Sequence, residues 1–308
     1  MIQVSQYEDL DALDAREWIR LARRGDLEGA WRMSDRIRQR HEWRRDWTIP
    51  RHLQHVWDGS ELAGRRVLIR CYHGLGDTIQ FIRYAPFVRT LAKKVIVWAQ
   101  PSLVPLLRSA SGIDRLLALH DGSPDVEYDV DIEVMELAYA FRTTLATIPH
   151  VVPYLAAVPL ALGGRRPRVG IVWRAGDWDA RRSIEFNVIR PLLDMTQFCW
   201  YSLQLETDKA MRHVNLHELD TRGLMRTARA IRAMDLVISI DSMSAHLAGA
   251  LGVPVWTLLP YDADWRWMDE RSDSPWYPTM RLFRQQVPGD WSSVIDEVRQ
   301  ATPKQLSS

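Results

Sequence analysis

Hydrophobic positions near the N-terminus repeat at helical spacing. Residues 10–24 and 27–37 each carry apolar side chains on one face and predict two helices. Gly25 ends the first helix, and Asp26 can cap the second. We therefore expect an antiparallel helix pair, followed by a glycine-bounded linker at residues 59–64.

From Arg66 onward, short apolar runs alternate with helical stretches. Continuous runs of Val, Ile and Leu are typical of parallel strands that are buried on both faces. A first series predicts strands at 66–71, 94–98, 115–119 and 129–134 and helices at 77–92, 102–110 and 137–147. A second series predicts strands at 168–173, 198–204, 215–218, 236–240, 254–259 and 280–284 and helices at 184–193, 222–234, 242–251 and 291–301.

This pattern predicts an α/β fold with two Rossmann-like, doubly wound domains that face each other across a cleft. Residues 1–50 form a helical extension, 51–163 the N-terminal domain and 164–290 the C-terminal domain. Residues 291–308 form a C-terminal helix and tail that we expect to pack back on the N-terminal domain. In such sheets ligands bind at the carboxyl ends of the strands, so the loops there are the candidate sites.

Composition excludes several classes of protein. The 40 basic and 39 acidic residues give a net charge of +1, so no overall field directs the chain to nucleic acid or to a membrane. Cys71 and Cys199 lie in apolar runs without metal-ligand spacing, which favours reduced thiols and a cytoplasmic location. No apolar stretch is long enough to cross a bilayer, so no transmembrane segment is expected.

A local basic stretch lies between Arg32 and Arg51, with seven arginines, three acids, and Trp43 and Trp47 between them. It could bind phosphate, lipid or RNA. We favour instead a solvated helix face on which arginines stack on the tryptophans, and we expect no nucleic-acid partner.

The turn CYHGLGDTIQF follows the first strand of the first series. The third glycine of a dinucleotide fingerprint is replaced by Ile79, so we exclude NAD. Gly74 and Gly76 allow a tight turn that presents His73 and Asp77, and either side chain can accept a proton from a hydroxyl group. The alternative for Asp77 is a cap on the following helix.

The stretch LVISIDSMSAHLAGALGVPVW predicts a strand that ends at Asp241 and leads directly into a helix. The free amides of Ser242, Met243 and Ser244 at a helix N-terminus form an anion site. His246 in the first turn can add a donor, and the alternative is a buried structural histidine.

The loop RAGDWDARRSI follows the first strand of the second series. Arg181, Arg182 and Ser183 lie just before a helix, where guanidinium groups and a hydroxyl suit a diphosphate. No phosphate loop with Gly-Lys-Ser/Thr occurs, and His213 and His217 lack a partner pair for a metal.

Together, the motifs GLGDT, RSI, DSMSAHLAGALGVPVWTLLP, DWRW and DSPWYPTMRLFRQ resemble the glycosyltransferases related to ADP-heptose heptosyltransferases, glycosyltransferase family nine. They are most similar to the bacterial subset found downstream of tetratricopeptide repeats. The resemblance implies a GT-B fold and inverting transfer that needs neither a metal nor a further cofactor. It also implies a nucleotide-sugar donor, with an ADP-sugar favoured.

The resemblance assigns the general base to Asp77. It places Asp241, Ser242 and His246 in the donor motif and Arg182 with Ser183 beside the diphosphate. The sequence departs from the family at Tyr72-His73, in the short loop before Arg182, and at Glu136, so the base stays open among Asp77, His73 and Glu136. Substrate contacts are expected from Gly74, Gly76, Thr78, Glu136, Trp173, Arg181, Arg182, Ser183, Gln204, Asp241, Ser242, Met243, Ser244 and His246.

We therefore expect a cytoplasmic bacterial glycosyltransferase that moves a sugar, with heptose from ADP-heptose favoured, to a hydroxyl of a glycan, a protein or a small molecule. The alternative is a non-catalytic nucleotide-sugar-binding or scaffold protein with the same fold.

Overall fold

The computed structural model describes residues 2–176, 179–204 and 212–306 of the chain. The chain divides into two compact units. Unit 1 comprises Met1–Val104, Ala110–Pro149 and Asp264–Arg271, and unit 2 comprises Pro105–Ser109, His150–Ala263 and Ser272–Ser308. The domain limits expected from the sequence, with a boundary after residue 163, stay a prediction.

Unit 1 begins with the predicted helix pair, α1 (Ile2–Arg23) and α2 (Leu27–Arg40). Gly25 adopts a φ of +81°, which ends α1, and the Asp26 carboxylate accepts a hydrogen bond from the Gly29 amide at 2.7 Å. The Trp31 indole donates to the Thr143 carbonyl at 2.7 Å. This bond ties the helix pair to the rest of unit 1.

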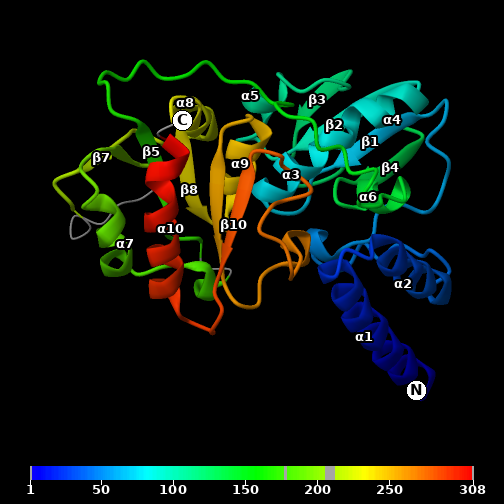
Figure 1. Cartoon of the computed structure of the whole chain (residues 1–308). Coiled ribbons are helices and arrows are strands. Elements are labelled where there is room, and N and C mark those ends of the chain that lie inside the picture. The colour runs from blue at the N-terminus through cyan, green and yellow to red at the C-terminus, as the bar shows by residue number, and fades with distance from the viewer. Residues whose placement is uncertain (1, 177–178, 205–211, 307–308) are drawn as a thin grey trace. The chain divides into compact units, whose positions relative to one another are not determined.

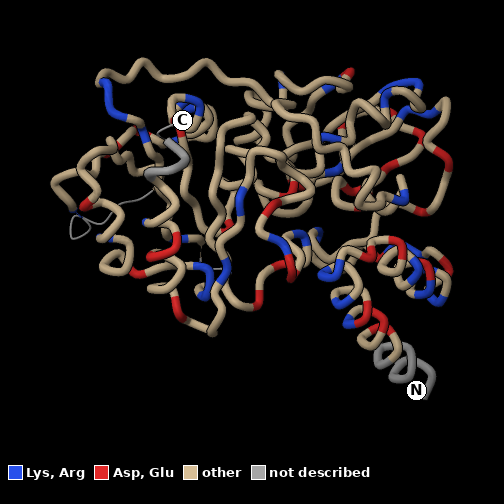
Figure 2. The backbone as a smooth tube through the Cα atoms, viewed as in Figure 1, with Lys and Arg blue, Asp and Glu red and all other residues tan. Residues whose placement is uncertain are grey.

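Acidic and basic residues alternate along the described parts of α1 and α2 (Figure 2). The Arg38 guanidinium lies 5.1 Å from the centre of the Trp43 ring, and that of Arg45 lies 5.6 Å from the centre of Trp47. The expected stacking of arginines on the tryptophans is therefore present, although Arg38 is buried rather than solvated, and the absence of a nucleic-acid partner stays a prediction.

The sheet of unit 1 is fully parallel in the order β3-β2-β1-β4. Its strands are β1 (Arg66–Arg70), β2 (Lys94–Ala99), β3 (Arg115–Ala118) and β4 (Val130–Glu133). Its helices are α3 (Leu75–Phe81), α4 (Ala85–Leu91) and α6 (Glu136–Ala140), with 3-10 turns η1 (Arg51–Leu53) and η2 (Ile82–Tyr84). The short helix α5 (Val104–Leu107) follows β2 in the chain, and its residues from Pro105 onward belong to unit 2. The chain moves outward from β1 to β3 and then returns to β4 on the other side of β1. The loops after β1 and β4 therefore diverge at a topological switch point.

Three helices predicted in the first series are wrong in their extent. Those predicted at 102–110 and 137–147 are shorter, at Val104–Leu107 and Glu136–Ala140. Residues 77–92 form α3 and α4, with η2 between them, rather than one helix. Pro86 lies in the first turn of α4, where its missing amide is tolerated, and this position starts a new helix.

Unit 2 contains a parallel sheet in the order β10-β9-β8-β5-β6-β7 (Figure 1). Its strands are β5 (Arg168–Val172), β6 (Cys199–Ser202), β7 (Leu216–Glu218), β8 (Leu236–Ile240), β9 (Val255–Leu259) and β10 (Met280–Arg284). Its helices are α7 (Phe186–Leu193), α8 (Leu224–Arg232), α9 (Met243–Ala250) and α10 (Trp291–Leu306), with the 3-10 turn η3 (Ala180–Arg182). The strand order reverses between β5 and β8, which is the switch point of this sheet.

Helix α10 packs beside α7 and against β10 within unit 2 (Figure 1). The expected packing of residues 291–308 on the N-terminal domain stays a prediction. Close packing also places α9 on β8 and β9. Gly249 of α9 allows the Tyr277 ring to approach this helix closely, because a Cβ at Gly249 would lie 2.4 Å from that ring.

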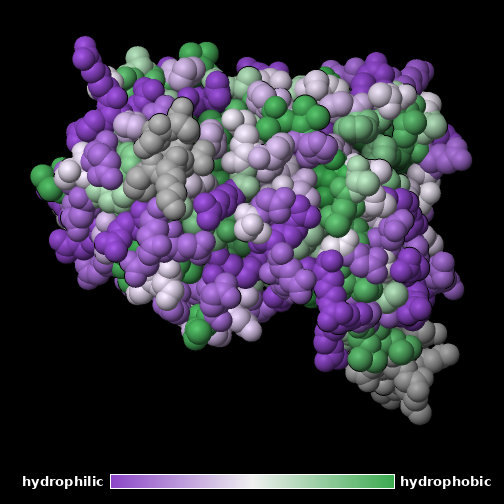
Figure 3. All heavy atoms as spheres, in the orientation of Figure 1, coloured by the Kyte–Doolittle hydropathy of each residue, from purple (hydrophilic) through white to green (hydrophobic). Residues whose placement is uncertain are grey.

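Both cysteines are buried free thiols, as expected. Leu10 and Leu13 of α1 are exposed, and hydrophobic atoms gather along this helix in Figure 3. In the described part of the chain, no helix is both long and apolar enough to cross a membrane.

Candidate functional site

A cavity of about 430 Å³ lies at the switch point of the sheet in unit 2. It is lined by residues that follow β5, β6 and β8: Arg174, Ala175, Gly176, Arg182, Gln204, Ser242, Met243 and Ser244, together with Val172 and Leu203. Its described lining holds two arginines and no acid, so the cavity favours an anion.

The N-terminus of α9 forms one wall of this cavity. Ser242 is the N-cap, with extended backbone, but its side chain does not cap the helix; its hydroxyl lies 3.1 Å from that of Ser239 instead. Helix geometry leaves the amides of the first turn, at Met243 and Ser244, without a partner inside the helix. These amides and the positive end of the helix dipole suit a phosphate group.

The two adjacent arginines expected at the diphosphate have different surroundings. Arg182 lines the cavity and donates through Nη1 to the Asp241 carbonyl at 3.1 Å. Its Nε is buried, and no hydrogen-bond partner for it exists in the described part of the chain. Arg181 is 69% exposed and pairs with Asp179 at 2.9 Å. The structure therefore brings Arg182 into the cavity and leaves Arg181 at the surface.

Two other predicted residues hold the cavity in shape. The Gln204 Oε1 accepts from the amides of Trp173 and Arg174, at 3.3 and 3.1 Å, and its Nε2 donates to the Arg174 carbonyl. The Ser183 hydroxyl accepts from the Ala175 amide at 3.1 Å. Both side chains thus fix the loop after β5. Residues 177–178 of that loop lie outside the described residues.

Three predicted residues lie deeper in unit 2. Asp241 is 7% exposed and His246 is 2% exposed, and the His246 Nδ1 lies 3.0 Å from the Tyr277 hydroxyl. This geometry favours the structural alternative for His246, and a ligand role stays a prediction. Trp173 is fully buried at the end of β5, beside the Phe186 ring.

In unit 1, the turn after β1 places Asp77 in the first turn of α3. Its Oδ2 accepts from the Gly74 amide at 3.0 Å, and its Oδ1 accepts from the Arg266 Nη1 at 2.9 Å. The capping alternative for Asp77 is therefore present, together with a buried arginine that the sequence analysis missed. Gly76 lies within α3, and Thr78 is buried, with its hydroxyl 3.1 Å from the Gln100 Oε1.

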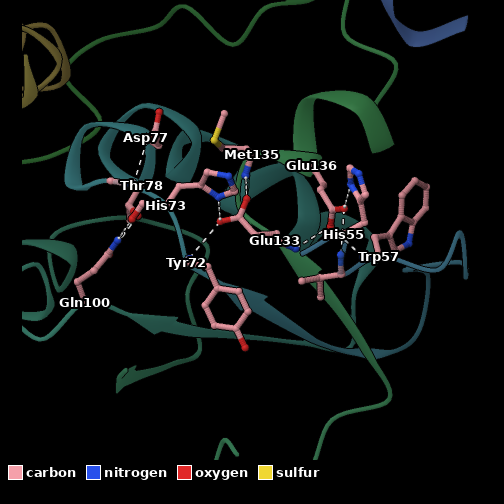
Figure 4. Close-up of polar contacts among 12 residues, drawn as sticks. His55, Trp57, Tyr72, His73, Asp77, Thr78, Gln100, Glu133, Met135 and Glu136 are labelled. Carbon is pink, nitrogen blue, oxygen red and sulfur yellow. Dashed lines mark hydrogen bonds and ion pairs between the residues drawn. The ribbon is translucent and has the colours of Figure 1, made fainter. Parts of the chain in front are cut away.

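His73 precedes this helix and points toward Glu133, the last residue of β4 (Figure 4). The His73 Nδ1 lies 3.0 Å from the Glu133 Oε1. Burial alone would lower the pKa of His73, but the hydrogen bond and the charge of Glu133 raise it above its usual value. The Gln100 side chain donates to the His73 carbonyl at 2.6 Å and fixes the backbone of the turn.

Glu133 is itself held rigidly. Its side chain is 1% exposed and accepts from the amides of Tyr72 and Met135, at 3.2 and 2.7 Å. These donors fix the carboxylate in place beside the imidazole. The histidine ring is therefore oriented by a fixed anion.

Glu136 occupies a different kind of position. Its carboxylate accepts from the amides of Val56, Trp57 and Glu133, at 3.1, 2.8 and 3.0 Å, and pairs with Arg38. Burial raises its pKa, but contacts that include the hydrogen bond from His55 and the charge of Arg38 hold it below its usual value. The many donors indicate that Glu136 fastens α2 and the segment with Val56 and Trp57 to the sheet.

A second cavity, of about 440 Å³, lies at the switch point of the sheet in unit 1. Helices α1 and α2 form one wall, with Trp18, Ile19 and Ile37, and the loops after β1 and β4 form another, with His73 and Met135. The predicted helix pair is therefore part of a candidate site, which its apolar pattern alone did not indicate.

Three further residues of these sites, Arg174, Glu133 and Arg266, were not predicted. Arg174 lies in the loop just after β5, so its place near a strand end was a usable signal. Within the described residues, no group of three or more His, Cys, Asp and Glu side chains is placed to hold a metal ion.

No family model matches the chain. Protein FlbA of Caulobacter vibrioides is 24% identical over 284 residues, which cover 80% of this chain and 47% of FlbA. The chain thus spans about half the length of this curated relative.

The match to several solved structures covers nearly the whole length of those proteins. A glycosyl transferase family 9 protein from Veillonella parvula has a TM-score of 0.59 and 11% identity, covering 80% of this chain and 99% of that chain. The E. coli ADP-heptose LPS heptosyltransferase II has a TM-score of 0.56 and 13% identity, covering 79% and 98%. The E. coli heptosyltransferase WaaC with ADP-2-deoxy-2-fluoro heptose has a TM-score of 0.53 and 12% identity, covering 78% and 99%. The chain has a GT-B glycosyltransferase fold.

Proposed function

We propose that this protein is an inverting, metal-independent glycosyltransferase that transfers a sugar from a nucleotide sugar to a hydroxyl acceptor. The observation that carries the proposal is the cationic cavity at the switch point of unit 2, where Arg182 and the first-turn amides of α9 converge. A diphosphate leaving group needs such donors as negative charge develops on it.

The favoured donor is ADP-heptose. Similar folds belong to heptosyltransferases, and structures of one of them contain ADP or an ADP-heptose analogue. We assign the donor to unit 2 and the acceptor to unit 1. We also place the protein in the cytoplasm of a bacterium and in the subset that follows tetratricopeptide repeats. The acceptor is a hydroxyl of a glycan, a protein or a small molecule.

The chemistry divides between the two units. In unit 1, a base removes the proton from the acceptor hydroxyl as its oxygen bonds to the anomeric carbon of the sugar. In unit 2, Arg182 and the amides of Met243 and Ser244 stabilise the diphosphate as its bond to that carbon breaks. The family resemblance names Asp77 as the base, and His73 and Glu136 are the alternatives.

A thermal-shift screen against ADP-, GDP-, UDP- and dTDP-sugars and NAD tests the donor. A ligand at 100 times its Kd adds about 2.7 kcal/mol of stability, so an ADP-sugar should raise the melting temperature and NAD should not. A response to UDP-sugars alone would reassign the donor. The absence of any response to nucleotide sugars would contradict the proposed function.

A turnover measurement distinguishes this enzyme from the alternative function. The alternative is a non-catalytic nucleotide-sugar-binding or scaffold protein. An enzyme releases ADP from the bound donor when an acceptor is present, and a binding protein does not. Binding without release under any acceptor condition would favour the alternative.

A further inference from the structure

We infer that the cavity of unit 1 binds an uncharged acceptor and that His73, held by Glu133, is the base that takes the acceptor's proton. This inference rests on the proposed function and names its acceptor site and base. It gives the helix pair α1–α2 a part in catalysis, because these helices form one wall of the cavity.

Position and partners favour His73 over the other candidate bases. His73 lines the cavity, and its Nδ1 contacts the fixed Glu133 carboxylate at 3.0 Å. The Glu133 carboxylate lies beside Nδ1 and favours the tautomer that carries its proton on this nitrogen, which leaves the Nε2 lone pair available to accept a proton. Glu136 already accepts from three backbone amides and Arg38. Asp77 is engaged through both oxygens, by Gly74 and Arg266.

The step balances without a co-reactant beyond donor and acceptor. The acceptor oxygen bonds to the anomeric carbon while its proton moves to the His73 Nε2. The bond between that carbon and the diphosphate oxygen breaks, and its electron pair leaves with the nucleoside diphosphate. The imidazolium, which the Glu133 anion stabilises, then returns its proton to solvent.

The charge of the cavity limits the acceptor. Its lining contains two carboxylates, Glu133 and Glu136, and one guanidinium, Arg38, and His73 must be neutral to act as the base. An acceptor with a carboxylate or phosphate near His73 would therefore meet net negative charge, and like charges repel more strongly in a partly buried site than in water. Trp18 and Ile37 belong to an apolar surface of the cavity instead. The acceptor class is an uncharged hydroxyl compound with an apolar face.

Several charged groups act on the titration of His73. Glu133 from β4, Asp77 from α3 and Glu136 from α6 each raise the pKa of His73. Arg38 from α2 pairs with Glu136, and His52 and His55 reach the cavity from residues 51–55. Because the base must be neutral, activity should rise with pH through the raised pKa of His73. Removing the Glu133 charge should shift this rise to lower pH.

A matched pair of acceptor probes tests the cavity: 4-methylumbelliferyl glucoside and 4-methylumbelliferyl glucuronide, which differ in one carboxylate. With ADP-heptose as donor, the glucoside should have a kcat/KM at least 10-fold above that of the glucuronide. Ile37→Trp, which fills the cavity, should abolish transfer to the glucoside, whereas Leu91→Trp, at an exposed position of α4, should not. Equal use of both probes, use of neither, or unaffected transfer in Ile37→Trp would overturn the assignment of the cavity.

A set of base variants tests His73, with ADP release measured from pH 5.5 to 9. His73→Gln should lose about 100-fold or more of turnover and the rise with pH, with donor affinity unchanged. Glu133→Gln should keep the rise but move it to lower pH, and Asp77→Asn should lose less than about 10-fold. A loss in Asp77→Asn as large as that in His73→Gln, or a pH profile that Glu133→Gln does not move, would overturn this inference.

Measured donor affinity shows whether the proposed function has failed or only the assignment of His73 as the base. If wild-type protein binds no nucleotide sugar, the proposed function fails, and this inference fails with it. If the donor binds in every variant and His73→Gln turns over at the wild-type rate, this inference alone fails.

Discussion

The cavities of the two units occupy the same topological position but carry opposite charge. Each lies where the order of a parallel sheet reverses. The cavity of unit 2 is lined by Arg174 and Arg182, with no acid among its described residues, whereas that of unit 1 is lined by Glu133, Glu136 and a single arginine. Strand order therefore explains where the two sites are, and the loop residues decide what each can bind.

The backbone has a different part in each site. In unit 2 the α9 amides face the cavity, and the Ser242 side chain does not cap them. In unit 1 the corresponding turn is capped, because Asp77 accepts from the Gly74 amide. One helix start thus carries no acid in its first turn, and the other carries a carboxylate there. A histidine beside this acidic turn is suited to proton transfer rather than to anion binding.

The largest effect is expected from Glu136→Ala. It leaves the Arg38 guanidinium buried without its carboxylate and removes an acceptor from three amides, so unit 1 should lose about 3–5 kcal/mol of stability. Chemical denaturation followed by tryptophan fluorescence measures the loss. The exposed Glu61→Ala is the control and should change stability by less than about 0.5 kcal/mol. A small loss of stability in Glu136→Ala would contradict the structural role assigned to Glu136.

Arg182→Ala tests whether the cavity of unit 2 binds the diphosphate. Loss of a charge-assisted contact to the diphosphate should weaken ADP binding by about 1.5–3 kcal/mol, roughly 10- to 150-fold. Calorimetric titration measures the affinity. The neighbouring Arg181→Ala is a matched control, because Arg181 is exposed and paired with Asp179, and its affinity should change little. Equal losses in both variants would place the nucleotide elsewhere.

Gly249→Ala tests how closely α9 must pack. The added Cβ would lie 2.4 Å from the Tyr277 ring, so the overpacked variant should be less stable by about 1–3 kcal/mol. Thermal unfolding measures the change. Gly163→Ala is the control, since a Cβ added there would have no neighbouring atom within 4 Å. An undisturbed melting temperature in Gly249→Ala would mean that α9 can shift freely.

Ser242→Ala should have the smallest effect on binding. The Ser242 hydroxyl lies 3.1 Å from that of Ser239, and the first-turn amides are the proposed donors to the anion, so ADP affinity should fall by less than about 1 kcal/mol. Ser242→Pro removes an amide and should weaken binding more. Calorimetric titration of both variants tests this order, and a larger loss in Ser242→Ala would assign the contact to the hydroxyl.

The pH dependence of stability gives a further check on unit 1. The folded pKa of Glu136 lies below the usual value of 4.5, so its contribution is present above pH 4.5 and is lost as the pH falls through the folded value. Wild-type protein should therefore lose more stability between pH 5 and pH 3 than Glu136→Gln. Equal slopes for the two proteins in acid denaturation would contradict the lowered pKa.

Regular elements could be predicted from the sequence because their signals are local. The strands at residues 236–240 and 280–284 are found with the predicted limits, and Asp26 caps α2 as expected. The continuous apolar runs and the capping residue contain this information without reference to the rest of the chain.

The side-chain partners in the sites could not be predicted in the same way. Arg266 lies 189 residues from Asp77, and Glu133 occupies the last position of an otherwise ordinary buried strand. No local periodicity relates either residue to the turn at residues 71–77. Only the folded sheet brings β4 beside β1 and so brings Glu133 to His73.

A crystal structure with bound ADP tests the central claim most directly. We predict that the diphosphate lies in the cavity of unit 2, with its oxygens about 2.7–3.1 Å from the amides of Met243 and Ser244 and from the Arg182 guanidinium. The cavity of unit 1 should contain no nucleotide. A diphosphate bound in unit 1, or in unit 2 without contact to Arg182 and the α9 amides, would contradict the assignment of donor and acceptor to the two sites.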